Sequence, residues 1–156
     1  SCEIWYRSFS STSRYLPKAN SLMRHHGKTY VRWNDLDAFG HINNANYLTF
    51  IQEVRADFTW YSRIAKGLKP MFSDMVVARA EIDYLEPINA GGFEIDIAVW
   101  VSKIGNSSFT LEYELTSKAG VHARARTVQV AVDMATKRSR AINDEERTLL
   151  TQYLEE

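Results

Sequence analysis

The feature that most constrains the fold of this sequence is the strict alternation of apolar and polar residues through its second half. The alternating runs are separated by turn signals at Gly91-Gly92, Gly105-Asn106 and Ala119-Gly120. Period-two alternation places one face of a strand on a core and the other toward solvent or a partner. Short turns between such runs make neighbouring strands antiparallel. The sequence therefore predicts strands over residues 78–84, 93–101, 109–115 and 121–134.

One long helix precedes these strands. Apolar residues recur there at steps of four and three and so share one helical face: Tyr47, Ile51, Val54, Phe58 and Tyr61. Leu48 and Phe50 widen that face. Asn43 and Asn44 are alternative N-cap residues, because a short polar side chain can accept a hydrogen bond from the first helical turn. Gly67 supplies the stop signal.

These elements fit one arrangement. A first strand over residues 28–33 precedes the helix, and Asn143, followed by three acidic residues, suits the N-cap of a short terminal helix. An antiparallel sheet left alone would expose its inner face, and only the long helix is large enough to cover it. We therefore predict an α+β fold, in which five or more antiparallel strands wrap around one long central helix.

Composition excludes several classes of protein. The chain has 156 residues, which suits one domain, and its formal net charge of zero argues against a dedicated nucleic-acid binder. Its one cysteine, Cys2, permits no intrachain disulfide and no cysteine–histidine zinc site. These features favour a reducing, cytoplasmic location. No apolar run approaches the ~18 residues of a membrane-spanning helix.

Residues 1–27 differ from the rest in composition. They carry four basic residues against the single acid Glu3, and they are rich in serine. A basic leader, an artefact of the upstream sequence and an arm that packs on the domain are alternative interpretations. We expect an appendage outside a domain that spans residues 28–156, although Trp5, Tyr6 and Phe9 could dock it.

The stretch between the first strand and the helix carries the chemistry. Residues 32–47 read RWNDLDAFGHINNANY and hold two acids, a glycine, a histidine and four asparagines. A plain connector needs only about 4–6 turn residues. This density of polar groups ahead of a helix N-terminus indicates a functional site.

This stretch resembles the 4-hydroxybenzoyl-CoA thioesterase-like branch of the hotdog superfamily. The pattern that carries the resemblance is D-x-D-x-x-G-H-x-N-N-x-x-Y, from Asp35 to Tyr47, with support from residues 78–88 and 127–134. The resemblance covers about residues 28–156. It implies the hotdog fold and the hydrolysis of an acyl-CoA or acyl-carrier-protein thioester.

The resemblance also implies roles for residues of the motif. Asp37 faces the thioester carbonyl and acts either as a nucleophile or as a general base toward water. Backbone N–H groups near Gly40 and His41, expected to be unpaired at the helix start, polarise the carbonyl oxygen. Asn44 stands where relatives often have a histidine or tyrosine that positions the substrate, which leaves its role in question.

Several residues of the motif have a structural alternative. Asp35 more often orients the loop than takes part in chemistry, and His41 is either a functional group or a hydrogen-bonded loop residue. Asn43 is a candidate for substrate binding or the plain helix cap. Tyr47 fits the core face of the helix, although its hydroxyl could reach a substrate. Glu53, on the polar side of the helix, is expected to be a solvated or interface charge.

A basic group lies on one face of the last long strand: His122, Arg124 and Arg126. Such a cluster could hold the phosphates of CoA. Charged residues that protect a strand edge from aggregation are at least as good an interpretation.

The resemblance further implies a homodimer or homotetramer, with domains paired edge to edge and the acyl chain bound between subunits. No metal or redox cofactor is required for this hydrolysis, and we expect no nucleic-acid partner. Two other functions remain open. One is a hydratase or dehydratase acting on an acyl thioester, and the other is a module that binds acyl-CoA without catalysis.

Overall fold

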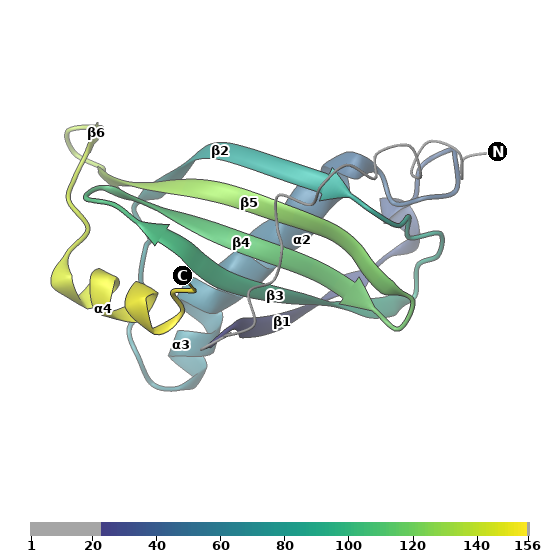
Figure 1. Cartoon of the computed structure of the whole chain (residues 1–156), viewed down its shortest axis with the longest axis horizontal. Coiled ribbons are helices and arrows are strands. Elements are labelled where there is room, and N and C mark those ends of the chain that lie inside the picture. Colours follow the sequence, from purple (N-terminus) through teal and green to yellow (C-terminus); the bar gives the residue numbers. More distant parts are fainter. Residues whose placement is uncertain (1–22, 156) are drawn as a thin grey trace.

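The computed structural model describes residues 23–155 and shows one curled antiparallel sheet (Figure 1). The strand order is β1-β3-β4-β5-β2, and the short β6 pairs with β5 beyond that path. The strands are β1 (His25–Val31), β2 (Met75–Tyr84), β3 (Phe93–Ile104), β4 (Ser108–Ser117), β5 (Gly120–Asp133) and β6 (Arg138–Ser139). The predicted α+β class and the antiparallel sheet are confirmed.

The long helix lies behind the sheet and crosses it diagonally (Figure 1). It begins as α2 (Asn44–Ala56), continues through the π-helical turn η2 (Asp57–Tyr61) and ends as α3 (Ser62–Ala65). Its buried residues include Tyr47, Phe50, Ile51, Val54 and Phe58, which confirms most of the predicted apolar face.

Two residues of that face are exposed instead. Tyr61 is 61% exposed because it is the last residue of the wider π-helical turn η2, which rotates it away from the predicted face. Leu48, which was expected to widen the face, is 45% exposed. The periodicity of a regular helix predicted neither outcome.

The core lies between the helix and the inner face of the sheet. Alternate residues of β3, β4 and β5 are fully buried there, among them Ile95, Val99, Leu111, Leu115 and Ala125. Burial of each of the isoleucine, valine and leucine side chains among them stabilises the fold by about 1.5–3 kcal/mol. The predicted alternation thus sets which strand face the helix covers.

The first strand begins earlier than predicted. His25 to Gly27 pair with Val99 to Ile97 of β3, and they therefore belong to the sheet. A Cβ atom on Gly27 would lie 2.8 Å from Cγ1 of Val54, so glycine here lets α2 approach β1 closely.

The residue ahead of that strand is also part of the domain. The Arg24 guanidinium forms an ion pair with Glu155 at 2.7 Å and stacks 3.8 Å from the centroid of the Trp100 ring. Residues 24–27, which we expected to lie outside the domain of residues 28–156, thus contact the rest of the fold. The interpretation of residues 1–22 lies outside the described residues.

The terminal helix α4 (Asp144–Gln152) confirms the predicted cap. The Asn143 side chain accepts a hydrogen bond from the N–H of Glu146 at 2.8 Å, and Glu146 returns one to the N–H of Asn143 at 3.0 Å. This helix lies against β3 at the end of the sheet away from the start of α2 (Figure 1). Within residues 23–155, no helix is long and apolar enough to cross a membrane.

Candidate functional site

The acidic stretch forms a tight loop between β1 and α2. A short 3-10 helix, η1 (Trp33–Asp35), leads into it, and an isolated bridge joins Leu36 to Ile42. Residues 37–41 project beyond that bridge as a turn. The N–H of Asp37 donates to the carbonyl oxygen of His41 at 2.8 Å, which closes the turn.

Gly40 is required by the shape of this turn. Its φ of +78° lies in the left-handed region that other residues adopt only with strain. Its N–H donates to the carbonyl of Asp37 at 3.1 Å. The expectation that this N–H is unpaired and free to polarise a substrate carbonyl is therefore wrong.

Asp37 is half-buried at the base of the turn. Its Oδ1 accepts a hydrogen bond from the N–H of Phe39 at 2.9 Å, which fixes the orientation of the carboxylate. No hydrogen bond or ion pair among the described residues engages its Oδ2. One oxygen of this carboxylate is thus anchored, and the other is open to a reacting group.

Asp35 holds the loop in place. Its side chain is 2% exposed; Oδ2 accepts from the backbone N–H of Arg32 at 2.8 Å, and Oδ1 accepts from the Arg32 guanidinium at 2.9 Å. Burial raises the pKa of this carboxyl, but the hydrogen bonds from Arg32 outweigh burial and leave its pKa below the usual value. Asp35 therefore stays ionised, and the structure assigns it the orienting role that was one of its two interpretations.

The same residue ties the loop to the helix. The carbonyl oxygen of Asp35 accepts from the N–H of Asn43 and from the side-chain amide of Asn46, both at 3.0 Å. These bonds connect the segment before Asp37 to the first turn of α2. The position of Asp37 relative to the helix N-terminus is thereby fixed from both sides.

Asn43 is the N-cap of α2. Its side chain accepts a hydrogen bond from the N–H of Ala45 at 3.0 Å, and its carbonyl accepts from the N–H of Asn46 at 2.9 Å. Asn44 is the first helical residue, and no hydrogen bond within residues 23–155 uses its N–H. This N–H is a donor at the positive end of the helix dipole.

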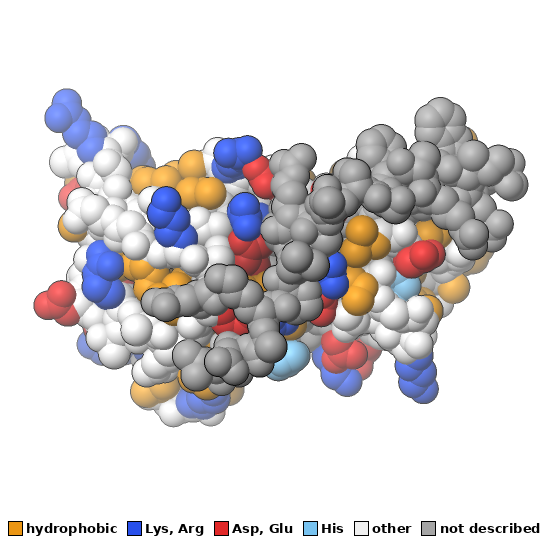
Figure 2. All heavy atoms as spheres, viewed as in Figure 1, with side chains coloured by type: hydrophobic (Ala, Val, Ile, Leu, Met, Phe, Trp, Pro, Cys, Tyr) orange, Lys and Arg blue, Asp and Glu red, His pale blue; other side chains and the backbone are white. Residues whose placement is uncertain are grey.

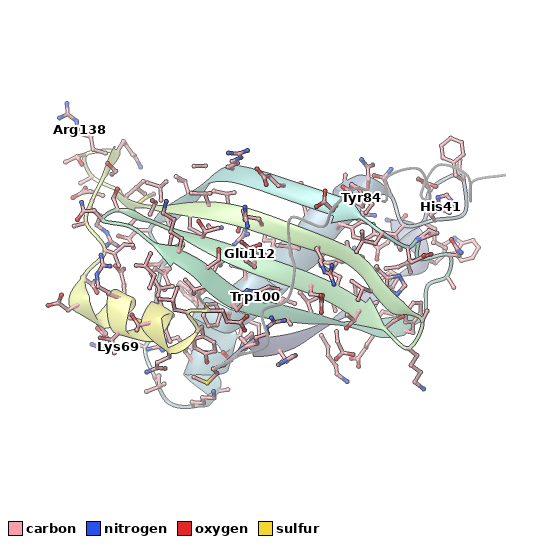
Figure 3. The ribbon with its side chains drawn as sticks, in the orientation of Figure 1. His41, Lys69, Tyr84, Trp100, Glu112 and Arg138 are labelled. Carbon is pink, nitrogen blue, oxygen red and sulfur yellow. The ribbon has the colours of Figure 1, made fainter. Side chains whose placement is uncertain are left out.

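Tyr84 was not identified from the sequence, yet it supports the helix start. Its hydroxyl donates to the carbonyl oxygen of Asn44 at 3.0 Å, and its ring packs edge-on against Tyr47 at 5.1 Å. Figure 3 shows Tyr84, at the end of β2, at the same end of the molecule as His41. The contact joins residues forty positions apart, so no local pattern signals it.

The remaining motif residues differ in exposure. His41 is partly exposed on the turn, whereas Tyr47 is 1% exposed beneath the helix start. Trp33 and Phe39 flank Asp37 in the sequence and are 85% and 76% exposed. The loop therefore presents apolar aromatic surface next to its carboxylate. Glu53 is exposed on the outer side of α2, as expected of a solvated or interface charge.

The basic group on β5 is paired with acids. Arg126 contacts Glu112 at 2.6 Å and Arg124 contacts Glu114 at 2.9 Å, across neighbouring strands. His122 is 3% exposed and bonded to Ser117 at 2.7 Å. Figure 2 shows acidic and basic side chains lying next to one another on the face of the molecule that it draws. The pairing favours the structural interpretation over phosphate binding.

No group of three or more histidine, cysteine, aspartate or glutamate residues in the described part of the chain could hold a metal ion. The loop and the helix start present the Asp37 carboxylate, the N–H of Asn44 and the positive end of the helix dipole.

Comparisons with known proteins agree with this geometry. A family model described as the thioesterase-like superfamily matches residues 31–149, which include the whole loop and helix. A 1,4-dihydroxy-2-naphthoyl-CoA hydrolase of Nostoc punctiforme is 32% identical over 129 residues, covering 80% of this chain and 82% of the relative. The long-chain acyl-CoA thioesterase FadM of Escherichia coli is 28% identical, covering 80% and 95%.

Solved structures share the fold. A thioesterase of Thermus thermophilus, in complex with coenzyme A and Zn, superposes with a TM-score of 0.66 at 29% identity and covers 80% of this chain and 90% of its own. The curled sheet around one long helix is thus a fold that this chain shares with a solved thioesterase.

Proposed function

This chain belongs to the thioesterase-like superfamily and is a thioester hydrolase, and we propose that it cleaves acyl-CoA thioesters with Asp37 as the working carboxylate. One observation carries the proposal. The Asp37 carboxylate has one anchored and one open oxygen, and its loop is bonded to the start of the longest helix. The proposed substrate is an acyl-CoA thioester. The alternative substrate is the acyl thioester of an acyl-carrier protein.

The open oxygen of Asp37 can serve in two ways. It attacks the acyl carbon and forms a mixed anhydride that water then hydrolyses, or it takes a proton from the water that attacks. In both routes water is consumed and the carbon–sulfur bond breaks. The sulfur leaves as thiolate and gains a proton, and the acyl group leaves as a free acid.

Negative charge develops on the carbonyl oxygen during this attack and needs a donor at that point. We assign this role to the N–H of Asn44, because the cap uses the N–H groups of Ala45 and Asn46 and the turn uses that of Gly40. The dipole of the 13-residue helix α2 adds positive potential at the same place. Gly40 contributes the shape of the turn.

The other motif residues support this centre. Asn43 fixes the helix start as its cap, and Tyr47 forms the buried floor beneath Asn44. Neither needs to touch the substrate for this role, so their binding roles remain predictions. His41, on the exposed side of the turn, is the side chain placed to contact the CoA portion.

A homodimer completes the proposal. Strand β2 bonds to β5 on one side only, and five consecutive residues, 76–80, are exposed although the other long strands are largely buried. In Figure 1 this strand forms the upper edge of the sheet. Antiparallel pairing of two β2 strands would close a twofold dimer and remove the exposed edge. A tetramer would then pair two such dimers.

The test is thiol release from a panel of acyl-CoAs by the native chain and by Asp37→Asn. Asparagine keeps the shape of the side chain but removes the charge, so we expect a fall in kcat of at least ~100-fold. Asp96→Asn is the matched control, because Asp96 is an exposed aspartate on β3. An acyl-enzyme trapped with hydroxylamine would identify Asp37 as nucleophile.

The outcomes separate the alternatives. An Asp37→Asn variant that keeps native activity would overturn the assignment of this carboxylate. A native chain that releases no thiol from CoA or carrier-protein thioesters would contradict the hydrolase. Hydration of an enoyl thioester, or binding of acyl-CoA without turnover, would then decide between the two other functions.

A further inference from the structure

A second feature, away from the Asp37 loop, is a cleft of about 300 Å³ beside the edge of the sheet. It lies between the second half of the long helix and the start of β2. Its lining includes Arg55, Thr59 and Trp60 from the helix, and Phe72, Met75 and Gln129 from the sheet side. A cavity of this size suits the acyl part of a small ligand.

The backbone around the cleft is irregular on both sides. The π-helical turn η2 forms one wall, and π-bulges are frequent at functional sites. On the opposite wall Phe72 has a φ of +60°, a conformation that costs a residue of this size about 1–3 kcal/mol. The Phe72 ring packs on Phe109 at 4.9 Å, which holds it there. Two departures from regular backbone thus shape one cavity.

The cleft has polar groups where a thioesterase that accepts only alkyl chains would need apolar ones. Gln129 is 1% exposed, and its amide donates to the Thr127 hydroxyl at 2.7 Å; that hydroxyl also bonds to Tyr113 at 2.9 Å. These side chains come from the core-facing side of β4 and β5. Burying such polar groups is unfavourable unless they are bonded, so their place beside the cavity is a specific feature of this chain.

Arg55 supplies the charge. It lies half-buried in the wall of the cleft, and none of the carboxylates within residues 23–155 forms an ion pair with it. The cleft has no acidic residue in its lining, so its net charge is positive. Guanidinium groups bind carboxylates through two parallel hydrogen bonds. The Arg55 guanidinium bonds to the Tyr113 hydroxyl, but no acidic residue of the lining balances its charge. A ligand carboxylate would supply that negative charge.

We propose that this cleft receives the far end of the acyl group and selects acyl groups that end in an oxygen acceptor, with a carboxylate preferred over a hydroxyl. The proposal rests on the thioesterase function above and names its substrate class. Trp60, Phe72 and Met75 contact the carbon chain, and Arg55 with Gln129 contacts the terminal oxygen.

The position of the cleft is compatible with this role in the dimer. Along α2, Arg55 lies roughly 17 Å from Asn44 in the same subunit, at 1.5 Å per residue. In an antiparallel β2 pair, the Met75 end of one strand lies beside the Tyr84 end of its partner. The cleft of one subunit then faces the partner's Asn44 and its Asp37 loop, which shortens the distance an acyl chain must span.

The experiment compares thioesters of equal length that differ only at the far end. Hexanoyl-CoA is paired with adipoyl-CoA, decanoyl-CoA with sebacoyl-CoA, and benzoyl-CoA with 4-hydroxybenzoyl-CoA. For the native chain we expect higher kcat/KM on the oxygenated member of at least one pair. Arg55→Met should lower that ratio by about 10- to 100-fold, the range of a hydrogen bond to a charged group. Arg55→Lys should restore part of it.

Controls separate this role from a structural one. Arg138→Met removes an exposed arginine of β6, labelled in Figure 3, that lines neither the cleft nor the Asp37 loop, and it should leave the ratio unchanged. The same pairs are also titrated by calorimetry onto Asp37→Asn, with and without Arg55→Met. Calorimetry measures the preference as a difference in binding affinity, without turnover.

The outcomes distinguish failure of the inference from failure of the function. A native chain that hydrolyses the plain alkyl thioesters at least as well as every oxygenated partner overturns the inference and leaves the hydrolase intact. If Arg55→Met lowers only the melting temperature and leaves the ratio of kcat/KM values unchanged, Arg55 has a structural role. That result also overturns the inference. If the preference in binding is lost with Arg55 although no thioester is cleaved, the cleft is supported and the hydrolase fails.

A mixed dimer tests the path between subunits. One subunit carries Asp37→Asn and the other Arg55→Met, and two tags allow the mixed species to be purified. If each cleft serves the partner's Asp37, one of the two sites is intact, and we expect about half the native activity on the oxygenated thioester. No recovery above the activity of the two variants alone would place the cleft and the carboxylate in the same subunit.

Discussion

Removal of the Asp35 carboxylate should destabilise the fold and weaken catalysis together. Asp35 is 2% exposed and accepts a hydrogen bond from the N–H of Arg32 at 2.8 Å. Asp35→Ala leaves that N–H without its acceptor, which costs about 2–3 kcal/mol for a bond to a charged group. The guanidinium of Arg32 is 63% exposed, so Arg32→Met should change stability much less.

The assay is unfolding in urea at one fixed protein concentration. Differences in concentration then do not alter the contribution of dimer dissociation to the unfolding midpoint. A loss of about 2 kcal/mol corresponds to a midpoint about 1 M lower at the usual slope for this size. Asp35→Asn should fall between the native chain and Asp35→Ala, because the amide oxygen can still accept from the Arg32 N–H. Activity of Asp35→Ala, measured where it is folded, should fall by up to ~100-fold as Asp37 loses its position.

The pH dependence has a defined sign. Because the folded pKa of Asp35 is lowered, its contribution is present above the unfolded pKa of about 3.9 and is lost as the pH falls through the folded value. The difference in free energy of unfolding between the native chain and Asp35→Asn should therefore be largest near pH 7 and should disappear as the pH falls below about 4. A gap below ~0.5 kcal/mol at pH 7, within the range of ordinary surface substitutions, would refute the reasoning.

Two further predictions concern packing and assembly. Gly27→Ala should lower the free energy of unfolding by about 1–3 kcal/mol, measured by chemical unfolding, because the new methyl would overlap Cγ1 of Val54. Val54→Ala in the same chain should relieve part of that cost. If the effects of the two substitutions on the free energy of unfolding simply add, the close approach is contradicted. Val76→Lys, at the exposed β2 edge, should shift the mass measured by light scattering toward that of the monomer. Met134→Lys, which changes a similarly exposed residue away from that edge, should leave the mass unchanged. If the Val76→Lys variant remains a dimer, another interface holds the subunits together.

The local patterns predicted the elements well, and their failures have local causes. The alternating runs became β2 to β5, and Asn43 and Asn143 became helix caps because each cap depends on contacts within four residues. Tyr61 departed from the helical pattern because it belongs to a π-helical turn. Gly40 has the turn conformation that favours glycine, yet its N–H bonds within that turn instead of facing a substrate.

Other features depended on long-range contacts. The first strand begins earlier than predicted, because no local pattern shows that Glu155 lies against Arg24 or that Val54 lies against Gly27. No local pattern singles out the hydroxyl of Tyr84 or the charge of Arg55 either. Their importance comes from what the folded chain places beside them.

The sequence by itself determined the class of fold, the order of its elements and the polar loop ahead of the long helix. Periodicity, caps and turn residues are local properties, and residue types within a few positions of each other fix them. Only the tertiary structure decided which oxygen of Asp37 is open, which helical N–H is unused and which arginine lines a cleft. Those properties depend on hydrogen-bond partners and burial, which exist only after distant segments have packed together.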